Sequence, residues 1–200
     1  MGLSWSAKSS CWANLRPQRE GISLKQKIRI GISACLLGHR VRYDGQHKLD
    51  VYLTRTLSDG FEYVPVCPEA ELGLGVPREP IRLEGHPDNP QLVALNSRTD
   101  LTQSMQAFCR TRIATLDGEN LCGYIFKSKS PSCGVERINV YPGATGSPSM
   151  SGRGIFAAIL MQHMPQLPIE EAHRLHDPAL CKRFIERVLL FKRELERADG

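Results

Sequence analysis

The chain of 200 residues lacks several features that mark large classes of protein. It contains no apolar run of the roughly 20 residues that a transmembrane helix requires, so we expect no membrane-spanning segment. It contains no internal repeat and no block of five or six basic residues. Its formal charge of +5 is scattered along the chain, which favours an ordinary solvated surface over a nucleic-acid-binding patch.

The first residues lack acidic side chains before Glu20 and lack the continuous apolar core of a secretory signal. Residues 1–26 are therefore predicted to be a disordered leader. The chain as a whole has 41% hydrophobic and 24% charged residues, which is the composition of a soluble globular protein. We expect it to reside in the cytoplasm.

The seven cysteines lack the spacing of common cysteine motifs: they stand at positions 11, 35, 67, 109, 122, 133 and 181. No Cys-x-x-Cys pair is present, although structural zinc sites usually take two ligands from one, and there is no compact run of cluster-binding cysteines. A small secreted disulfide scaffold would be shorter and would follow a signal peptide. The cysteines are therefore metal ligands, catalysts or small core residues.

Alternating apolar residues predict the first strand, because Ile28, Ile30 and Ile32 recur at period two within residues 27–34. Further strands are predicted at 62–66 and 123–126, and helices at 49–57, 100–116, 152–163 and 178–197. This alternation predicts a single-domain α/β sandwich with a mainly parallel central sheet flanked by helices. We expect residues 27–170 to form that domain and residues 171–200 to form a C-terminal helix.

Three smaller features complete the predicted fold. Residues 79–83 and 91–95 are expected to pair as an accessory hairpin, and residues 167–169 to form a short edge strand. Thr99 or Asp100 is expected to cap the helix that follows. Residues 142–152 are rich in Gly, Ser and Pro and are expected to be a mobile loop.

Three of the predicted strands lead to a cysteine, namely Cys35, Cys67 and Cys133. Side chains just past parallel strands gather at one edge of the sheet, so these thiols could converge. Three thiolates can hold zinc or three irons of a cubane cluster, and three protein ligands would leave one coordination position open. Three buried core cysteines at strand ends are the alternative that the residues alone leave open.

Three motifs resemble those of the thiouracil desulfurase family, and they occur in the family's order. They are Ser-Ala-Cys-Leu-Leu-Gly at 33–38 with Val-Arg-Tyr-Asp-Gly at 41–45, Pro-Val-Cys-Pro-Glu at 65–69, and Lys-Ser-Lys-Ser-Pro-Ser-Cys-Gly at 127–134. The resemblance runs from about residue 28 to residue 163. The segments 167–171 and 184–188 resemble the junction in longer members, so the chain is similar to the N-terminal domain of two-domain relatives.

The resemblance implies a [4Fe-4S] cluster held by Cys35, Cys67 and Cys133, with one iron that the protein does not ligate. It also implies that Glu69 and Ser130 are catalytic. The implied reaction removes sulfur from a thiolated pyrimidine such as 2-thiouracil and gives the oxo base and sulfide without net redox change.

Alternatives remain open for individual residues and for the whole protein. Glu69 could instead serve the N-terminus of the next helix, and Lys127 and Lys129 could either face solvent or offset the charge of the cluster. The whole protein could be a non-catalytic iron–sulfur or zinc module that senses metal or docks a partner. An RNA-binding role, with thiolated tRNA as substrate, is a third hypothesis; a small thiolated nucleobase is the expected partner.

Overall fold

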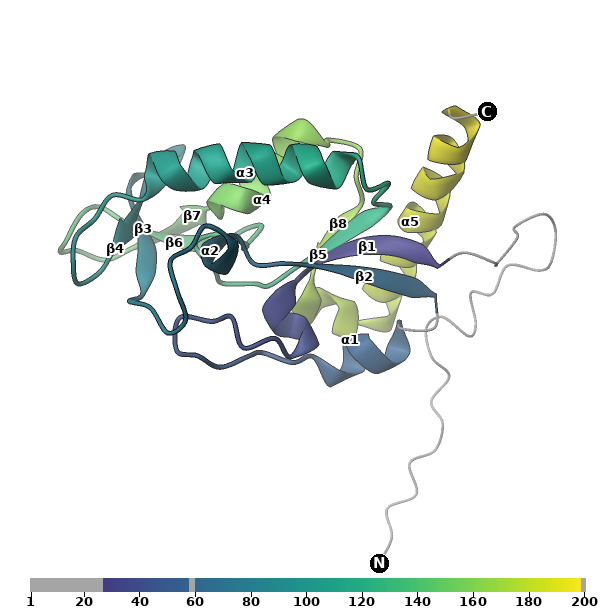
Figure 1. Cartoon of the computed structure of the whole chain (residues 1–200), viewed down its shortest axis with the longest axis horizontal. Helices are drawn as coiled ribbons and strands as arrows, with labels where there is room; N and C mark the ends of the chain where they lie inside the picture. The colour runs from purple at the N-terminus through teal and green to yellow at the C-terminus, as the bar shows by residue number, and fades with distance from the viewer. Residues whose placement is uncertain (1–26, 58–59, 199–200) are drawn as a thin grey trace, which may run out of the picture.

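Two four-stranded sheets and their flanking helices make up the protein, as a computed structural model shows for residues 27–57 and 60–198 (Figure 1). The predicted leader, residues 1–26, lies outside the described residues. In chain order the elements are β1 (Ile28–Ser33), η2 (Ala34–Leu37), α1 (Val51–Thr56), β2 (Phe61–Val66), α2 (Pro68–Glu71), β3 (Ile81–His86), β4 (Asn89–Ala94), α3 (Thr102–Asp117), β5 (Gly123–Phe126), β6 (Ile138–Tyr141), β7 (Ser149–Gly152), α4 (Ile155–His163), β8 (Ile169–Glu171), η3 (Ala172–His176) and α5 (Pro178–Ala198).

The first sheet is entirely parallel, with the strand order β2-β1-β5-β8. From β1 the chain first adds β2 on one side and later adds β5 on the other. The strand order therefore reverses between β1 and β5, and open α/β sheets bind ligands in the crevice beyond such a switch point. The predicted α/β fold with a parallel central sheet is confirmed.

Side-chain alternation on the strands divides the core between the two faces of this sheet. Ile30, Ile32 and Ile125 pack with side chains of α1 and α5. Tyr124 and Phe126 point the other way and pack beneath α3 and α4, and the two helix layers are seen on opposite sides of the strands (Figure 1). The strand predicted from the period-two isoleucines is confirmed, and the isoleucines form one of its two covered faces.

The second sheet has the order β4-β3-β6-β7 and lies beyond the carboxyl ends of the first sheet's strands (Figure 1). The predicted hairpin is confirmed as the antiparallel pair β3 and β4. The prediction of a loop over 142–152 is wrong in part, because residues 149–152 form β7 and pair with β6. The first three residues of β7 are exposed, so no apolar alternation revealed the strand.

The helices predicted at 49–57, 100–116 and 178–197 are α1, α3 and α5, with ends within two residues of those predicted. Helix α4 begins at Ile155 rather than at residue 152, because residues 149–152 form β7. Asp177 caps α5, since its Oδ1 accepts hydrogen bonds from the amides of Ala179 (2.8 Å) and Leu180 (3.1 Å). The predicted cap of α3 is wrong by one residue: Leu101 occupies the cap position, and the Asp100 carboxylate accepts the Thr102 amide instead. None of the helices in the described ranges is long and apolar enough to cross a membrane. The division of the chain at residue 170 stays a prediction.

A buried carboxylate, Glu84, stabilises the second sheet. Its side chain is 6% exposed and accepts hydrogen bonds from both terminal nitrogens of Arg98 at 2.7 Å and from Arg82 Nε at 2.7 Å. The Arg98 hydrogen bonds, with those of Arg82, lower the pKa of Glu84 to about 2. A carboxyl whose folded pKa is depressed stabilises the fold above its ordinary pKa, and this stability is lost as the pH falls toward the folded value.

We predict that Glu84→Gln lowers the free energy of unfolding by about 2 kcal/mol at pH 7, because two guanidinium groups lose a charged acceptor. The difference between the variant and the wild type should shrink as the pH falls from about 4.5 toward about 2. Urea denaturation across this pH range measures both effects. Asp88→Asn, at an exposed site on the same hairpin, is the control and should leave stability unchanged. An equal loss in the control, or a Glu84→Gln effect independent of pH, would contradict the assignment.

Candidate active site

The three predicted cysteines lie at the carboxyl edge of the first sheet. Cys35 is in η2 directly after β1, Cys67 follows β2 at the start of α2, and Cys133 is in the loop after β5. All three line one cavity of about 270 Å³, which sits at the switch point between β1 and β5. The second sheet contributes to the wall of the cavity through Ile81 at the start of β3.

Burial and mutual proximity dominate the electrostatics of these thiols. Burial first and the neighbouring Cys67 next raise the pKa of Cys35 to about 11, although Lys127 opposes the shift. Burial also raises the pKa of Cys67. The pKa of Cys133 is raised well above its usual range by burial first and by Glu69 next. Each thiol thus lies within electrostatic reach of another, as expected of groups around one cavity.

The N-terminus of α4 holds the Cys133 loop in place. The amides of Gly154, Ile155 and Phe156 donate hydrogen bonds to the carbonyls of residues 134, 131 and 132, at 2.8, 3.1 and 3.0 Å. The first amides of a helix have no partner inside the helix, so the loop satisfies them. A Cβ built on Gly154 would lie 2.5 Å from the Ser132 carbonyl carbon and oxygen, so the close approach requires glycine here.

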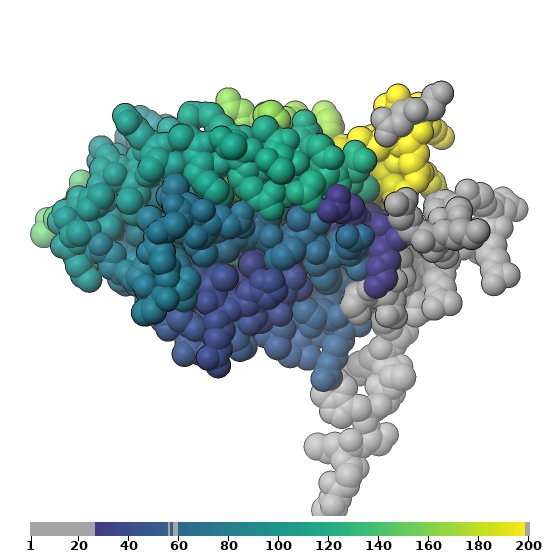
Figure 2. All heavy atoms as spheres, in the orientation of Figure 1, coloured from purple at the N-terminus to yellow at the C-terminus, as the bar shows by residue number. Residues whose placement is uncertain are grey.

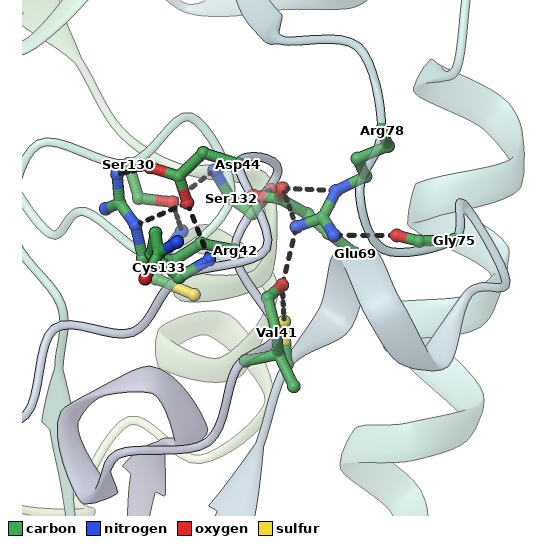
Figure 3. A network of polar contacts seen from close by, with 11 residues as sticks. Val41, Arg42, Asp44, Glu69, Gly75, Arg78, Ser130, Ser132 and Cys133 are labelled. Carbon is green, nitrogen blue, oxygen red and sulfur yellow. Dashed lines mark hydrogen bonds and ion pairs between the residues drawn. The ribbon is translucent and has the colours of Figure 1, made fainter.

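Glu69 projects from α2 into the same cavity, and both of its carboxylate oxygens have partners (Figure 3). Oε2 accepts from Arg78 Nη2 at 2.7 Å and from Arg78 Nε at 3.2 Å. Oε1 accepts from the Ser132 hydroxyl at 2.9 Å. The alternative role at the helix start belongs to Glu71, whose Oε1 accepts the Cys67 amide at 2.7 Å.

Arg78 and Ser132 were missed by the sequence analysis. Ser132 lies inside the third motif, yet its sequence position did not show that its fully buried hydroxyl faces Glu69. Arg78 follows a Gly/Pro-rich stretch, and its amide donates to the Tyr43 carbonyl at 2.9 Å. On the molecular surface, segments around residues 40 and 75 lie side by side for this reason (Figure 2). Arg78 contacts Glu69 because the loops that hold the two residues meet in the folded protein.

Ser130 lines the cavity and also organises the Cys133 loop. Its Oγ accepts the amides of Cys133 at 3.1 Å and of Ser132 at 3.3 Å. A hydroxyl has two acceptor positions and one proton, so both acceptor positions are occupied and the proton is free for another acceptor. Ser130 thus holds the Cys133 loop through its oxygen and keeps a hydroxyl proton that it can donate.

The two lysines of the third motif lie in different surroundings. Lys127 is half-buried and lines the cavity, and burial lowers its pKa while Cys35 and Cys133 oppose that shift. Its ammonium donates to the Ser128 carbonyl. Lys129 lines the same cavity but is exposed. Lys127 therefore brings positive charge to the thiols, whereas Lys129 faces solvent at the rim.

Comparison with known proteins identifies the family. A family model described as 2-thiouracil desulfurase matches residues 30–172. The chain belongs to the 2-thiouracil desulfurase family. This confirms the family expected from the three motifs.

This desulfurase family member is also similar to two other known proteins. The uncharacterized protein YbbK of Bacillus subtilis (strain 168) is 32% identical over 136 residues, covering 66% of this chain and 88% of YbbK. The solved structure of the [4Fe-4S]-dependent thiouracil desulfidase TudS matches with a TM-score of 0.62 and 32% identity. That match covers 78% of this chain and 97% of TudS.

The three thiols that line the cavity are of the residue type that binds iron–sulfur clusters. Among residues 27–57 and 60–198, no three His, Cys, Asp or Glu side chains are grouped closely enough to hold one metal ion. In a cubane cluster each cysteine binds a different iron, so the sulfurs lie farther apart than around one zinc. Cys35, Cys67 and Cys133 form no disulfide, so their thiols are available as ligands.

We predict that Gly154→Ala destabilises this family member by about 2 kcal/mol, because the added methyl group pushes against backbone atoms of the Cys133 loop. Thermal and urea denaturation measure the change. Gly118→Ala is the matched control, because Gly118 has a helical φ of −70° and its nearest neighbour would be 3.6 Å from the new Cβ. A Gly154→Ala protein as stable as the control would contradict the packing described here.

Proposed function

We propose that the protein removes sulfur from a thiolated pyrimidine such as 2-thiouracil, using a [4Fe-4S] cluster that is bound by Cys35, Cys67 and Cys133. The observation that carries the proposal is one cavity lined by three thiols together with Glu69 and Ser130. Membership of the 2-thiouracil desulfurase family and the likeness to TudS support it. Cys35, Cys67 and Cys133 form no disulfide, which is compatible with a reducing cytoplasm.

Three protein ligands on a four-iron cluster would leave one iron without a protein ligand. That iron would supply a Lewis-acidic, thiophilic position for the thiocarbonyl sulfur. Lys127, beside Cys35 and Cys133, would offset part of the negative charge of the thiolates and cluster. Of the two roles expected for Lys127, its place at the cavity favours charge compensation over exposure to solvent.

The chain's own groups would carry the proton transfers. Glu69 would accept a proton from the water that adds to the ring carbon. Oε1 is the better placed of its two oxygens, because its one partner in the described part of the chain is Ser132, whereas Oε2 accepts two hydrogen bonds from Arg78. Ser130 would donate its free proton to the substrate. The oxygen of water replaces the sulfur on carbon and the sulfur leaves as sulfide, so no electrons are gained or lost overall.

Anaerobic reconstitution with iron and sulfide tests the cofactor. We predict about four irons per chain and a brown protein that converts 2-thiouracil to uracil and sulfide. Cys35→Ala, Cys67→Ala and Cys133→Ala should each lose most of the iron. Cys122→Ala, a buried cysteine outside this cavity, should keep it. Iron retained by all three cavity variants would overturn the ligand set, and a full cluster without sulfide release would favour a sensing or docking module.

Substitution of the two proposed proton-transfer residues tests the chemistry. We predict that Glu69→Gln lowers kcat by about 100-fold or more and Ser130→Ala by about 10- to 100-fold, the range for loss of a general acid or base. Iron content per chain should stay at the wild-type value in Glu69→Gln. A Glu69→Gln enzyme with wild-type kcat would remove Glu69 from the reaction.

A further inference from the structure

We propose that Arg78 is the positioning residue of this site, which fixes the Glu69 carboxylate relative to the cysteines without contacting the substrate. The proposal rests on the function proposed above and adds a residue that the sequence motifs do not contain. The Arg78 guanidinium has three partners inside the protein, Glu69, Gly75 and Val41 (Figure 3).

Nearly every donor of Arg78 is used by the protein itself. Nε and Nη2 donate to Glu69 Oε2, Nη1 donates to the Gly75 carbonyl at 2.9 Å, and Nη2 also donates to the Val41 carbonyl at 3.0 Å. A guanidinium has five N–H donors, so four are engaged. A residue whose donors are so committed holds its neighbours in place and has little left for a ligand.

The Val41 carbonyl lies between Arg78 and Cys67. It accepts a hydrogen bond from Arg78 Nη2 at 3.0 Å, and its oxygen lies 3.7 Å from Cys67 Sγ, so it is next to one of the proposed ligands. Val41 also follows the Cys35 turn closely in sequence, and the Cys35 carbonyl accepts the Lys48 amide, which closes that loop. The Val41 carbonyl thus contacts both Arg78, which holds Glu69, and Cys67.

Burial makes the pair strong and demanding in geometry. The Arg78 side chain is 5% exposed and that of Glu69 is 14% exposed. Charge-assisted hydrogen bonds gain strength in such surroundings, and the planar guanidinium donates in fixed directions to several acceptors at once. A lysine ammonium is a single point on a flexible stem, so it cannot reach Glu69, Val41 and Gly75 together.

The test compares Arg78→Gln and Arg78→Lys in the reconstituted enzyme. We expect kcat to fall by about 100-fold in Arg78→Gln and by more than 10-fold in Arg78→Lys, because misplacing a catalytic group costs this much. KM, the dissociation constant of uracil and the iron content should each stay within about threefold of wild type. A positioning role also predicts that Arg78→Gln causes no further loss in a Glu69→Gln background.

Two additional variants separate positioning from general structural damage. Ser132→Ala removes the other partner of Glu69 and should lower kcat by about 10-fold, again only when Glu69 is present. Arg112→Gln removes a guanidinium from Glu71 on the same short helix (2.9 Å) but outside the cavity, and should keep activity within about twofold of wild type. If Arg78→Gln fails to fold, Ser132→Ala carries the test through the same carboxylate.

The outcomes distinguish this inference from the proposed function. Wild-type enzyme that releases no sulfide overturns the function and the inference with it. Active wild-type enzyme with unchanged kcat in Arg78→Gln overturns the inference alone. So does weaker uracil binding with a raised KM, because Arg78 would then contact the substrate, and so does additional loss in the Arg78→Gln/Glu69→Gln double variant.

Discussion

Parallel pairing of β1 with β2 on one side and β5 on the other is the constraint on which the site depends. It places the carboxyl ends of three strands next to one another, and each end leads into a loop that carries a cysteine. A parallel neighbour requires a long crossover connection, so the cysteines are far apart in sequence. The sheet edge can thus gather the proposed ligands without a local Cys-x-x-Cys pair.

Two supports outside the first sheet complete the cavity. The N-terminus of α4 holds the loop of Cys133 through its otherwise unpaired amides, and Gly154 permits the close contact. Arg78 holds Glu69 from a loop that pairs with the segment after Cys35. The proposed ligands and the proposed base are thus attached to one framework, which is the preorganisation that proton transfer beside a desolvated centre requires.

Local features of the fold could be predicted from the sequence, whereas most long-range contacts could not. The isoleucines of β1, the hairpin of the second sheet and the cap at Asp177 were all predictable because periodicity and capping are encoded within a few residues. Strand β7 was missed because its first residues are polar and exposed. Arg78 and Ser132 were missed because their role depends on loops that meet only after folding, and no local pattern records that Arg78 faces Glu69.

The central claim is that three cysteines from three strand ends share one cluster and that Glu69 faces its open side. An anaerobic crystal structure of the reconstituted Glu69→Gln variant with bound 2-thiouracil tests this claim most directly. The account predicts a four-iron cluster bonded to Cys35, Cys67 and Cys133 alone, with the substrate sulfur toward the remaining iron and residue 69 beside the ring. A fourth protein ligand on the cluster, or a cluster bound outside this cavity, would contradict it.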